Sequence, residues 1–169
     1  MHPMADEAAF DAFVVNRTAA LMRTAYLLTR DHQLAEDLLQ TALFKAAKSW
    51  ERIEGTPEPY VRRILYTENI SWWRRRRHLL ETSTSPGEDR ARPEPDVELH
   101  VTLERALDQL TSKQRTVLVL RYYEDLTEAE TARVLRIGLG TVKSMQRQAL
   151  SRLRALSPGM VSLIGDGHE

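Results

Sequence analysis

Two tryptophans stand directly before four consecutive arginines in the segment SWWRRRRH, residues 71–78. Indole rings stack on exposed bases and guanidinium groups pair with phosphates, so this combination is typical of a surface that holds single-stranded nucleic acid. A membrane-surface helix would need a continuous apolar face instead. The apolar residues preceding this run are needed inside a helical bundle, and Glu68 interrupts them. We therefore favour a nucleic-acid surface, with a solvated run of charge as the alternative.

The basic run ends a helix that we expect over residues 59–80. At about 100° per residue, its core-facing stripe consists of Val61, Leu65, Trp72 and Leu79. Trp73 lies about 100° away from Trp72, so it is the better candidate for an exposed ring that stacks on a base. The candidate nucleic-acid residues of this helix are Arg63, Thr67, Ser71, Trp73, Arg74, Arg75, Arg76 and Arg77.

The segment LTEAETARVLRIGLGTVKSMQRQALSRLR, residues 126–154, has the pattern of a helix-turn-helix. We expect a short helix over about 128–135, a turn containing Gly138 and Gly140, and a longer helix from about Thr141. In this motif the first helix braces the second in the major groove of DNA. The second helix turns one face away from its apolar residues Val142 and Leu153. That face carries Lys143, Ser144, Arg147, Ser151 and Arg154.

The charge of the second helix distinguishes a DNA contact from an ordinary solvated face. Residues 141–154 contain four basic side chains and no acidic side chain. Such a segregation favours contact with phosphates, and the solvated face remains the alternative.

The segment LAEDLLQTALFKAAKSW, residues 34–50, places an aromatic ring on a polar helix face. Its apolar stripe consists of Leu34, Ala35, Leu38, Leu39, Ala42 and Ala46. The opposite face consists of Asp37, Gln40, Thr41, Phe44 and Lys48. Phe44 has no core to enter from there, which favours a protein-contact surface. A further helix that simply covers the ring is the alternative.

Composition divides the chain into two helical parts. Residues 10–80 and 101–156 have helical periodicity, whereas residues 81–100 gather Ser, Thr, Pro and acidic side chains and carry a net charge of −4. Such a segment is typical of a flexible linker. We expect an all-α fold of two small helical domains joined by this flexible acidic linker, the second a helix-turn-helix domain. The tail, residues 157–169, is expected to be disordered.

Several classes of protein are disfavoured by composition. The chain has 24 basic and 24 acidic residues and no cysteine, which excludes disulfides and thiolate metal sites. No apolar run approaches the roughly 20 residues that span a bilayer, and the acidic start MHPMADEAAF lacks a signal-peptide pattern. We therefore expect a cytoplasmic protein. Its five histidines are scattered, so we expect no catalytic centre, metal or cofactor.

Taken in order, these segments resemble a known family. DHQLAEDLLQTALFKAAKSW, PYVRRILYTENISWWRRRR, the acidic linker and LTSKQRTVLVLRYYEDLTEAETARVLRIGLGTVKSMQRQALSRLR resemble an extracytoplasmic-function (group IV) sigma factor of bacterial RNA polymerase. The ISWWRRRR ending resembles the SigE-like actinobacterial branch. The resemblance covers about residues 10–156.

The resemblance implies a role for each part. The 34–50 helix would dock on the clamp helices of the largest polymerase subunit through Asp37, Gln40, Thr41, Phe44 and Lys48. The first domain would melt and read the promoter −10 element. The −35 element would be read by Thr141, Lys143, Ser144, Arg147, Gln148, Ser151 and Arg154. The implied partners are core RNA polymerase, including the flap of its second-largest subunit, promoter DNA and an anti-sigma factor, without membrane insertion.

The sequence departs from the family pattern at two places. An asparagine commonly lies four residues before the position of Ser71, but Thr67 stands there and Asn69 follows two residues later. Met145 stands where an arginine is frequent.

The alternative function is a free-standing helix-turn-helix regulator that binds duplex DNA without core polymerase. Such a regulator would have no need of the face that bears Phe44.

Overall fold

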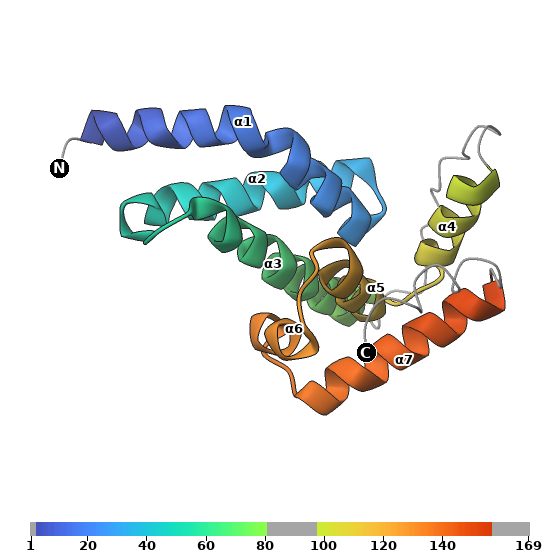
Figure 1. Cartoon of the computed structure of the whole chain (residues 1–169). Coiled ribbons are helices and arrows are strands. Elements are labelled where there is room, and N and C mark those ends of the chain that lie inside the picture. Colours follow the sequence, from blue (N-terminus) through green and yellow to red (C-terminus); the bar gives the residue numbers. More distant parts are fainter. Residues whose placement is uncertain (1–2, 81–97, 157–169) are drawn as a thin grey trace. The chain divides into compact units, whose positions relative to one another are not determined.

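The computed structural model describes residues 3–80 and 98–156, and these are helical with short connections and no strand (Figure 1). The all-α expectation is therefore confirmed. The chain divides into two compact units, Met1–Trp72 and Trp73–Glu169. The linker, residues 81–97, and the tail, residues 157–169, lie outside the described residues.

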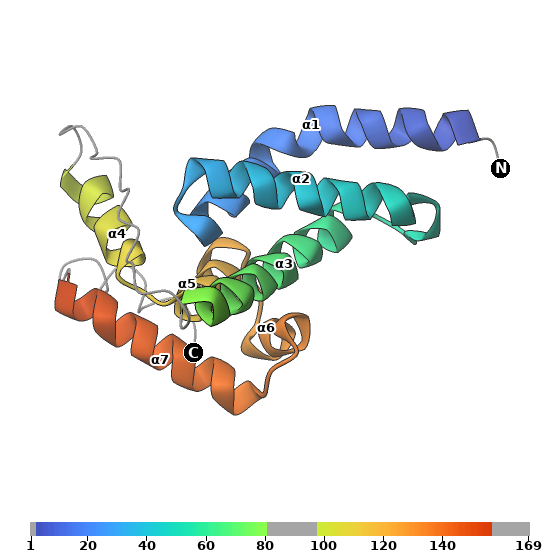
Figure 2. The same cartoon turned by 180° about the vertical axis from the view of Figure 1, so that it is seen from behind.

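Unit 1 begins with a pair of antiparallel helices, α1 (Pro3–Thr29) and α2 (His32–Ser49), which lie side by side in both ribbon views (Figures 1 and 2). Helix α1 therefore begins before residue 10, where we expected the first domain to start. Arg30 turns the chain between them with a φ of 57°. Asp31 then caps α2, because its side chain accepts a hydrogen bond of 2.9 Å from the Leu34 amide.

A short 3-10 turn, η1 (Trp50–Arg52), leads to α3 (Pro57–Leu80). Helix α3 starts two residues before the expected Pro59, at a proline that suits the first helical position. It is tied to both earlier helices, since Arg62 Nη1 donates to Thr24 Oγ1 at 2.7 Å and Lys45 forms an ion pair with Glu68. The fully buried residues of unit 1 include Leu21, Ala25, Leu28, Ala35, Ala42, Ala46, Val61 and Leu65.

Unit 2 contains α4 (Glu98–Asp108), α5 (Ser112–Leu118), the π-helical turn η2 (Val119–Tyr123), α6 (Glu128–Leu135) and α7 (Leu139–Leu156). Helix α6 has the predicted bounds, whereas α7 starts two residues before Thr141. Helix α4 starts at Glu98, inside the segment assigned to the linker. Helix α7 packs against α4, α5 and α6, so it is the central element of the unit.

Reciprocal side-chain caps start two helices of unit 2. At the start of α5, the Thr111 hydroxyl accepts a hydrogen bond from the Gln114 amide, and the Gln114 side chain accepts one from the Thr111 amide. Thr127 and Glu130 form the same pair of bonds at the start of α6. Two clusters then form the core beneath α7. One contains Ala106, Leu110, Leu118, Ala149 and Leu153, and the other contains Val117, Ala132 and Val142.

Candidate nucleic-acid and polymerase interfaces

The polar face of α2 is open to solvent. Asp37, Gln40, Thr41, Phe44 and Lys48 are all exposed, and the Phe44 side chain has 61% of its surface accessible. No described residue buries this ring, so the alternative of a covering helix finds no support within unit 1. On the other side of α2, five of the six predicted apolar positions are buried and Leu34 is half-buried.

Helix α3 divides its side chains between core and surface largely as the periodicity predicts. Val61 and Leu65 are fully buried. Trp72 is only half-buried, so its assignment to the core was right in part. Asn69 is 1% exposed and belongs to the interior, which places it away from any surface that could read a base.

The candidate nucleic-acid residues of α3 differ in accessibility. Arg63, Arg74 and Arg75 are exposed, whereas Thr67 and Ser71 are half-buried. The Thr67 hydroxyl donates to the carbonyl oxygens of Arg63 and Ile64, at 3.0 and 3.2 Å. Only its lone pairs and methyl group are therefore free to meet a ligand. The side chains of the remaining candidates, Trp73, Arg76 and Arg77, lie outside the described part of the chain.

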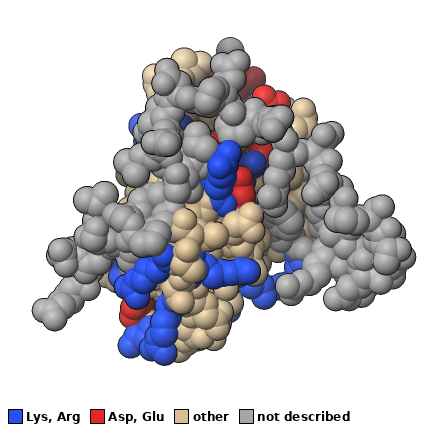
Figure 3. Space-filling model, turned by 90° about the vertical axis from the view of Figure 1, so that its right-hand side faces the viewer, with Lys and Arg blue, Asp and Glu red and all other residues tan. Residues whose placement is uncertain are grey.

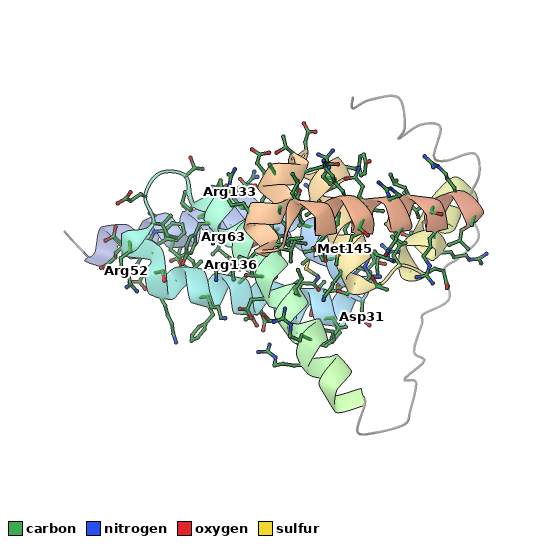
Figure 4. The ribbon with its side chains drawn as sticks, turned by 90° about the horizontal axis from the view of Figure 1, so that it is seen from below. Asp31, Arg52, Arg63, Arg133, Arg136 and Met145 are labelled. Carbon is green, nitrogen blue, oxygen red and sulfur yellow. The ribbon has the colours of Figure 1, made fainter. Side chains whose placement is uncertain are left out.

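An open hollow of about 280 Å³ lies where η1 leads to α3. Ser49, Arg52, Ile53 and Tyr60 line it, and Arg52 is labelled in Figure 4. Gly55 closes the connecting loop with a φ of 78°, a conformation that glycine adopts readily. Sequence reasoning assigned the first domain as a whole to the −10 element and did not single out Arg52 or Tyr60. An arginine and a tyrosine at the two ends of a short glycine-containing loop were the available signal.

Helix α1 holds both ends of this loop. The Trp50 ring packs against Phe10 and Phe13, with centroid distances of 5.1 and 5.3 Å. At the other end, Glu58 Oε1 accepts hydrogen bonds from Arg17 and from Arg62, whose Nη2 lies 2.8 Å away. These contacts join residues far apart in the sequence, so periodicity could not reveal them.

The electrostatics of Glu58 follow from this arrangement. Partial burial acts to raise the pKa of Glu58, but the hydrogen bonds and positive charges of Arg17 and Arg62 outweigh it. The pKa of this carboxyl therefore lies below its ordinary value. The ionised carboxylate stabilises the first turn of α3 against α1.

The outer face of α7 is exposed along its whole length. It presents Thr141, Lys143, Ser144, Arg147, Gln148, Ser151 and Arg154 to solvent. Lys143 Nζ lies 3.9 Å from Oε2 of Glu128, on α6. In Figure 3, blue side chains gather at the lower edge of the view with little red among them. The face is thus a basic surface on a rigid helix, as a groove-reading helix requires.

The inner face of α7 accounts for the departure at Met145. Val142 and Ala149 are fully buried, and the half-buried Met145 packs on the Val117, Ala132 and Val142 cluster (Figure 4). An apolar side chain therefore replaces the frequent arginine at the edge of the core, where it cannot act as a base-reading cation.

Two further arginines lie at the turn of the helix-turn-helix. Arg133 and Arg136 are exposed at the end of α6, and Arg136 adopts a left-handed conformation with a φ of 54° (Figure 4). Sequence reasoning did not single them out. Their position immediately before the turn was the available signal, because residues bordering a recognition helix commonly contact phosphates.

Both units match models of known protein domains. Residues 15–79 match sigma-70 region 2, and residues 106–155 match sigma-70 region 4. The RNA polymerase sigma-E factor of Streptomyces coelicolor is 40% identical over 152 residues, covering 86% of this chain and 84% of that protein. The ECF RNA polymerase sigma factor SigM of Mycobacterium tuberculosis is 31% identical over 161 residues, covering 92% and 80%.

The fold has a counterpart among solved structures. The sigma factor RpoE from Bartonella quintana, solved in complex with the anti-sigma factor NepR, has a TM-score of 0.68 and 25% identity, with 94% of this chain and 99% of that chain covered. Regions 2 and 4 stand in the same chain, and the sigma-E relatives match along most of their length. The chain belongs to the sigma-70 family as an extracytoplasmic-function sigma factor of the actinobacterial sigma-E type, a dissociable subunit that directs RNA polymerase to promoters at the start of transcription.

Proposed function

We propose that this sigma factor docks on core RNA polymerase through the polar face of α2. The observation that carries the proposal is Phe44, an aromatic side chain 61% exposed in the middle of a polar helix face. Aromatic side chains that become buried at protein interfaces contribute strongly to binding. Asp37, Gln40, Thr41 and Lys48 surround it with groups that can pair with a charged partner. The clamp helices of the largest subunit are the proposed partner.

The rest of the first domain, residues 10–80, is proposed to open and read the −10 element. Arg63, Arg74 and Arg75 supply exposed cations along α3, and the hollow beside Arg52 and Tyr60 could receive an unpaired base. Thr67 and Ser71 would lie against the strand, with Trp73, Arg76 and Arg77 continuing the surface. Stacking and phosphate contacts would hold the separated strands of any promoter, so base selection would depend on the hollow and on Thr67.

Unit 2 is proposed to read the −35 element in the major groove. The exposed donors of α7, from Thr141 to Arg154, would enter the groove, while Arg133 and Arg136 would contact the flanking phosphates. Under this proposal residues 10–80 form the core-binding and −10 domain, residues 81–100 the linker, and residues 101–156 the −35 domain. The flap of the second-largest subunit is the proposed polymerase partner of unit 2.

Regulation by an anti-sigma factor is also part of the proposal. The sigma factor RpoE from Bartonella quintana was solved with an anti-sigma factor bound. By extension, an anti-sigma factor would hold this chain away from core polymerase.

The protein would act in the cytoplasm, beside core polymerase, without a catalytic centre of its own. No group of three or more potential metal ligands occurs among the described residues, and no helix there is long and apolar enough to cross a membrane.

The experiment is transcription in vitro from a pool of genomic fragments, with core polymerase alone and with core polymerase plus this chain. We expect starts at a limited set of promoters that share −10 and −35 elements, only when the chain is present. A chain that binds duplex DNA by itself and adds no start sites would instead be a free-standing helix-turn-helix regulator.

A further inference from the structure

A chain of side-chain amides leads from the start of α5 to the outer face of α7. Gln114 Oε1 accepts a hydrogen bond from the Thr111 amide at 3.2 Å. Gln114 Nε2 donates to Gln148 Oε1 at 3.3 Å, and Gln148 Nε2 donates to Ser144 Oγ at 3.5 Å. Gln114 is buried, at 9% exposure, whereas Gln148 and Ser144 are exposed on the proposed DNA-reading face.

The direction of this chain is fixed at its buried end. A backbone N–H can only donate, so the group of Gln114 that faces Thr111 must be its carbonyl oxygen. The NH2 group of Gln114 therefore faces Gln148, and the atom of Gln148 that accepts its hydrogen bond must be the side-chain oxygen. The orientation of the Gln148 amide, normally free to flip, is thus set by the cap of a different helix.

This orientation decides what Gln148 can offer to DNA. Its oxygen is turned inward toward Gln114, and its NH2 group is left with one hydrogen for a ligand beyond the contact with Ser144. Ser144 Oγ accepts from Gln148, so this contact does not use the hydroxyl proton of Ser144, which can donate to a ligand. The pair thus presents two donors toward a ligand, while the Gln148 oxygen is engaged by Gln114.

We propose that Gln114 is a positioning residue that makes Gln148 and Ser144 read guanine in the −35 element. The guanine edge in the major groove offers two acceptors, N7 and O6, which two donors match. A glutamine that reads adenine must aim both its oxygen and its NH2 group at one base, and the contact with Gln114 prevents this. The inference rests on the proposed role of α7 in −35 recognition.

The test uses holoenzyme reconstituted from core polymerase and the full chain, with promoters varied one base at a time across the −35 element. Wild-type holoenzyme is expected to prefer guanine over adenine about tenfold at one position, and Gln148→Ala to remove that preference. These two base preferences test the orientation of the Gln148 amide even without a variant of residue 114. A Gln148-dependent preference for adenine or cytosine in the wild type would overturn the proposal.

The decisive variant is Gln114→Glu. A glutamate can still accept from the Thr111 amide, so the cap of α5 is retained. It cannot donate to Gln148, which would turn its NH2 group inward and its oxygen toward the groove. The preference is then expected to move from guanine to a base that offers a donor, adenine or cytosine. Gln109→Glu adds the same charge at an exposed position and should leave the preference unchanged.

A second variant of Gln114 keeps the proposal testable if Gln114→Glu does not fold. Gln114→Met keeps the length of the side chain but releases the Gln148 amide, so discrimination between guanine and adenine should fall to about twofold or less. If Gln148→Ala changes the preference while both folded variants of Gln114 leave it intact, the amide chain does not position Gln148. A wild type indifferent to every −35 base would instead contradict the proposed role of α7 and the guanine preference together.

Discussion

Lys48 places its ammonium group 4.4 Å from the centre of the Phe44 ring, on the exposed face of α2. A cation at this distance is attracted by the ring face and restrains both side chains. The contact therefore favours this position of the ring before any partner arrives, with most of the ring surface still accessible. A preorganised aromatic group of this kind loses less conformational freedom on binding.

Removal of this ring should weaken the association with core polymerase. For Phe44→Ala combined with Gln40→Ala, we expect a loss of about 2 kcal/mol or more of binding free energy, roughly 30-fold in affinity, with unchanged thermal unfolding. Co-purification and titration with core polymerase measure the effect. Val15→Ala is the matched control, because Val15 is 82% exposed on α1 and lies on no proposed interface. Undiminished binding by the folded double variant would remove this face as the dock.

Arg147→Ala should distinguish a base contact from a phosphate contact on α7. A base contact would cost about 1–3 kcal/mol and relax the preference at one −35 position, whereas a phosphate contact would weaken all sequences alike and reduce the salt dependence. Holoenzyme binding to a panel of −35 variants at two salt concentrations separates the two. Arg152→Ala is the control, because Arg152 is exposed about 140° around the same helix. Equal results for the two variants would show that α7 has been oriented wrongly.

Thr67 and Asn69 should differ in what their loss affects. We expect Thr67→Ala to change the −10 base preference, since Thr67 reaches the surface with its methyl group and lone pairs. Asn69→Ala should lower the free energy of unfolding by about 1–3 kcal/mol, because Asn69 is a buried polar side chain. Transcription from promoters varied only in the −10 element, together with thermal unfolding, measures both. A shift of base preference for Asn69→Ala alone would assign the reading to the other face of α3.

Arg74 and Arg75, both exposed, should support strand opening to the same extent at promoters of different sequence. Their joint replacement by alanine is expected to reduce strand opening at all promoters together and to lower the salt slope by about 0.7 per lost phosphate contact. Permanganate reactivity of unpaired thymines reports the opening. Arg23→Ala on α1 removes an exposed arginine outside the proposed surface and serves as the control. A loss confined to a few promoters would mean that these arginines read bases.

The acid sensitivity of unit 1 should depend on Glu58. Because the pKa of Glu58 is lower in the folded state, its contribution to stability is present above the unfolded pKa of about 4.3 and is lost as the pH falls through the folded value. Glu58→Gln is therefore expected to destabilise by about 1 kcal/mol at pH 7 and to flatten the acid limb of the stability profile. Urea unfolding from about pH 7 down to below the unfolded pKa of about 4.3 measures this. Glu54→Gln, an exposed change in the loop before α3, should have no effect. If the Glu58 variant and the wild type have the same acid limb, the role of this carboxylate is contradicted.

Helices α2, α3, α6 and α7 could be predicted because each one carries its own signals. Thr127 and Glu130 mark the start of α6, and helical spacing identified the buried positions of α2 and α7. Small errors arose at helix starts. Pro57 and Leu139 each begin a helix two residues before the expected position, because the first helical turn needs no intrahelical amide partner and leaves a weak pattern.

The contacts between elements could not be predicted in the same way. Trp50 meets Phe10 and Phe13, and Gln114 meets Gln148, across separations in sequence that no periodicity encodes. The π-helical turn also escaped prediction, since residues 119–123 read as an ordinary continuation of a helix. Such features depend on tertiary packing, which determines the loop of unit 1 and the amide orientation on α7.

The turn η2 also bears on how the length of this chain can vary. A π-turn holds one residue more than the α-helical turn it replaces. Within this turn, Arg121 Nε donates to Gln146 of α7 at 3.0 Å, and Arg121 Nη1 donates to the Leu126 carbonyl. Deletion of a single residue within 119–123 would restore the α-helical path and rotate the preceding or following side chains by about 100°. Both contacts of Arg121 would then be lost at once. Homologous chains that lack one residue in this turn should therefore also lack the pair formed by Arg121 and Gln146.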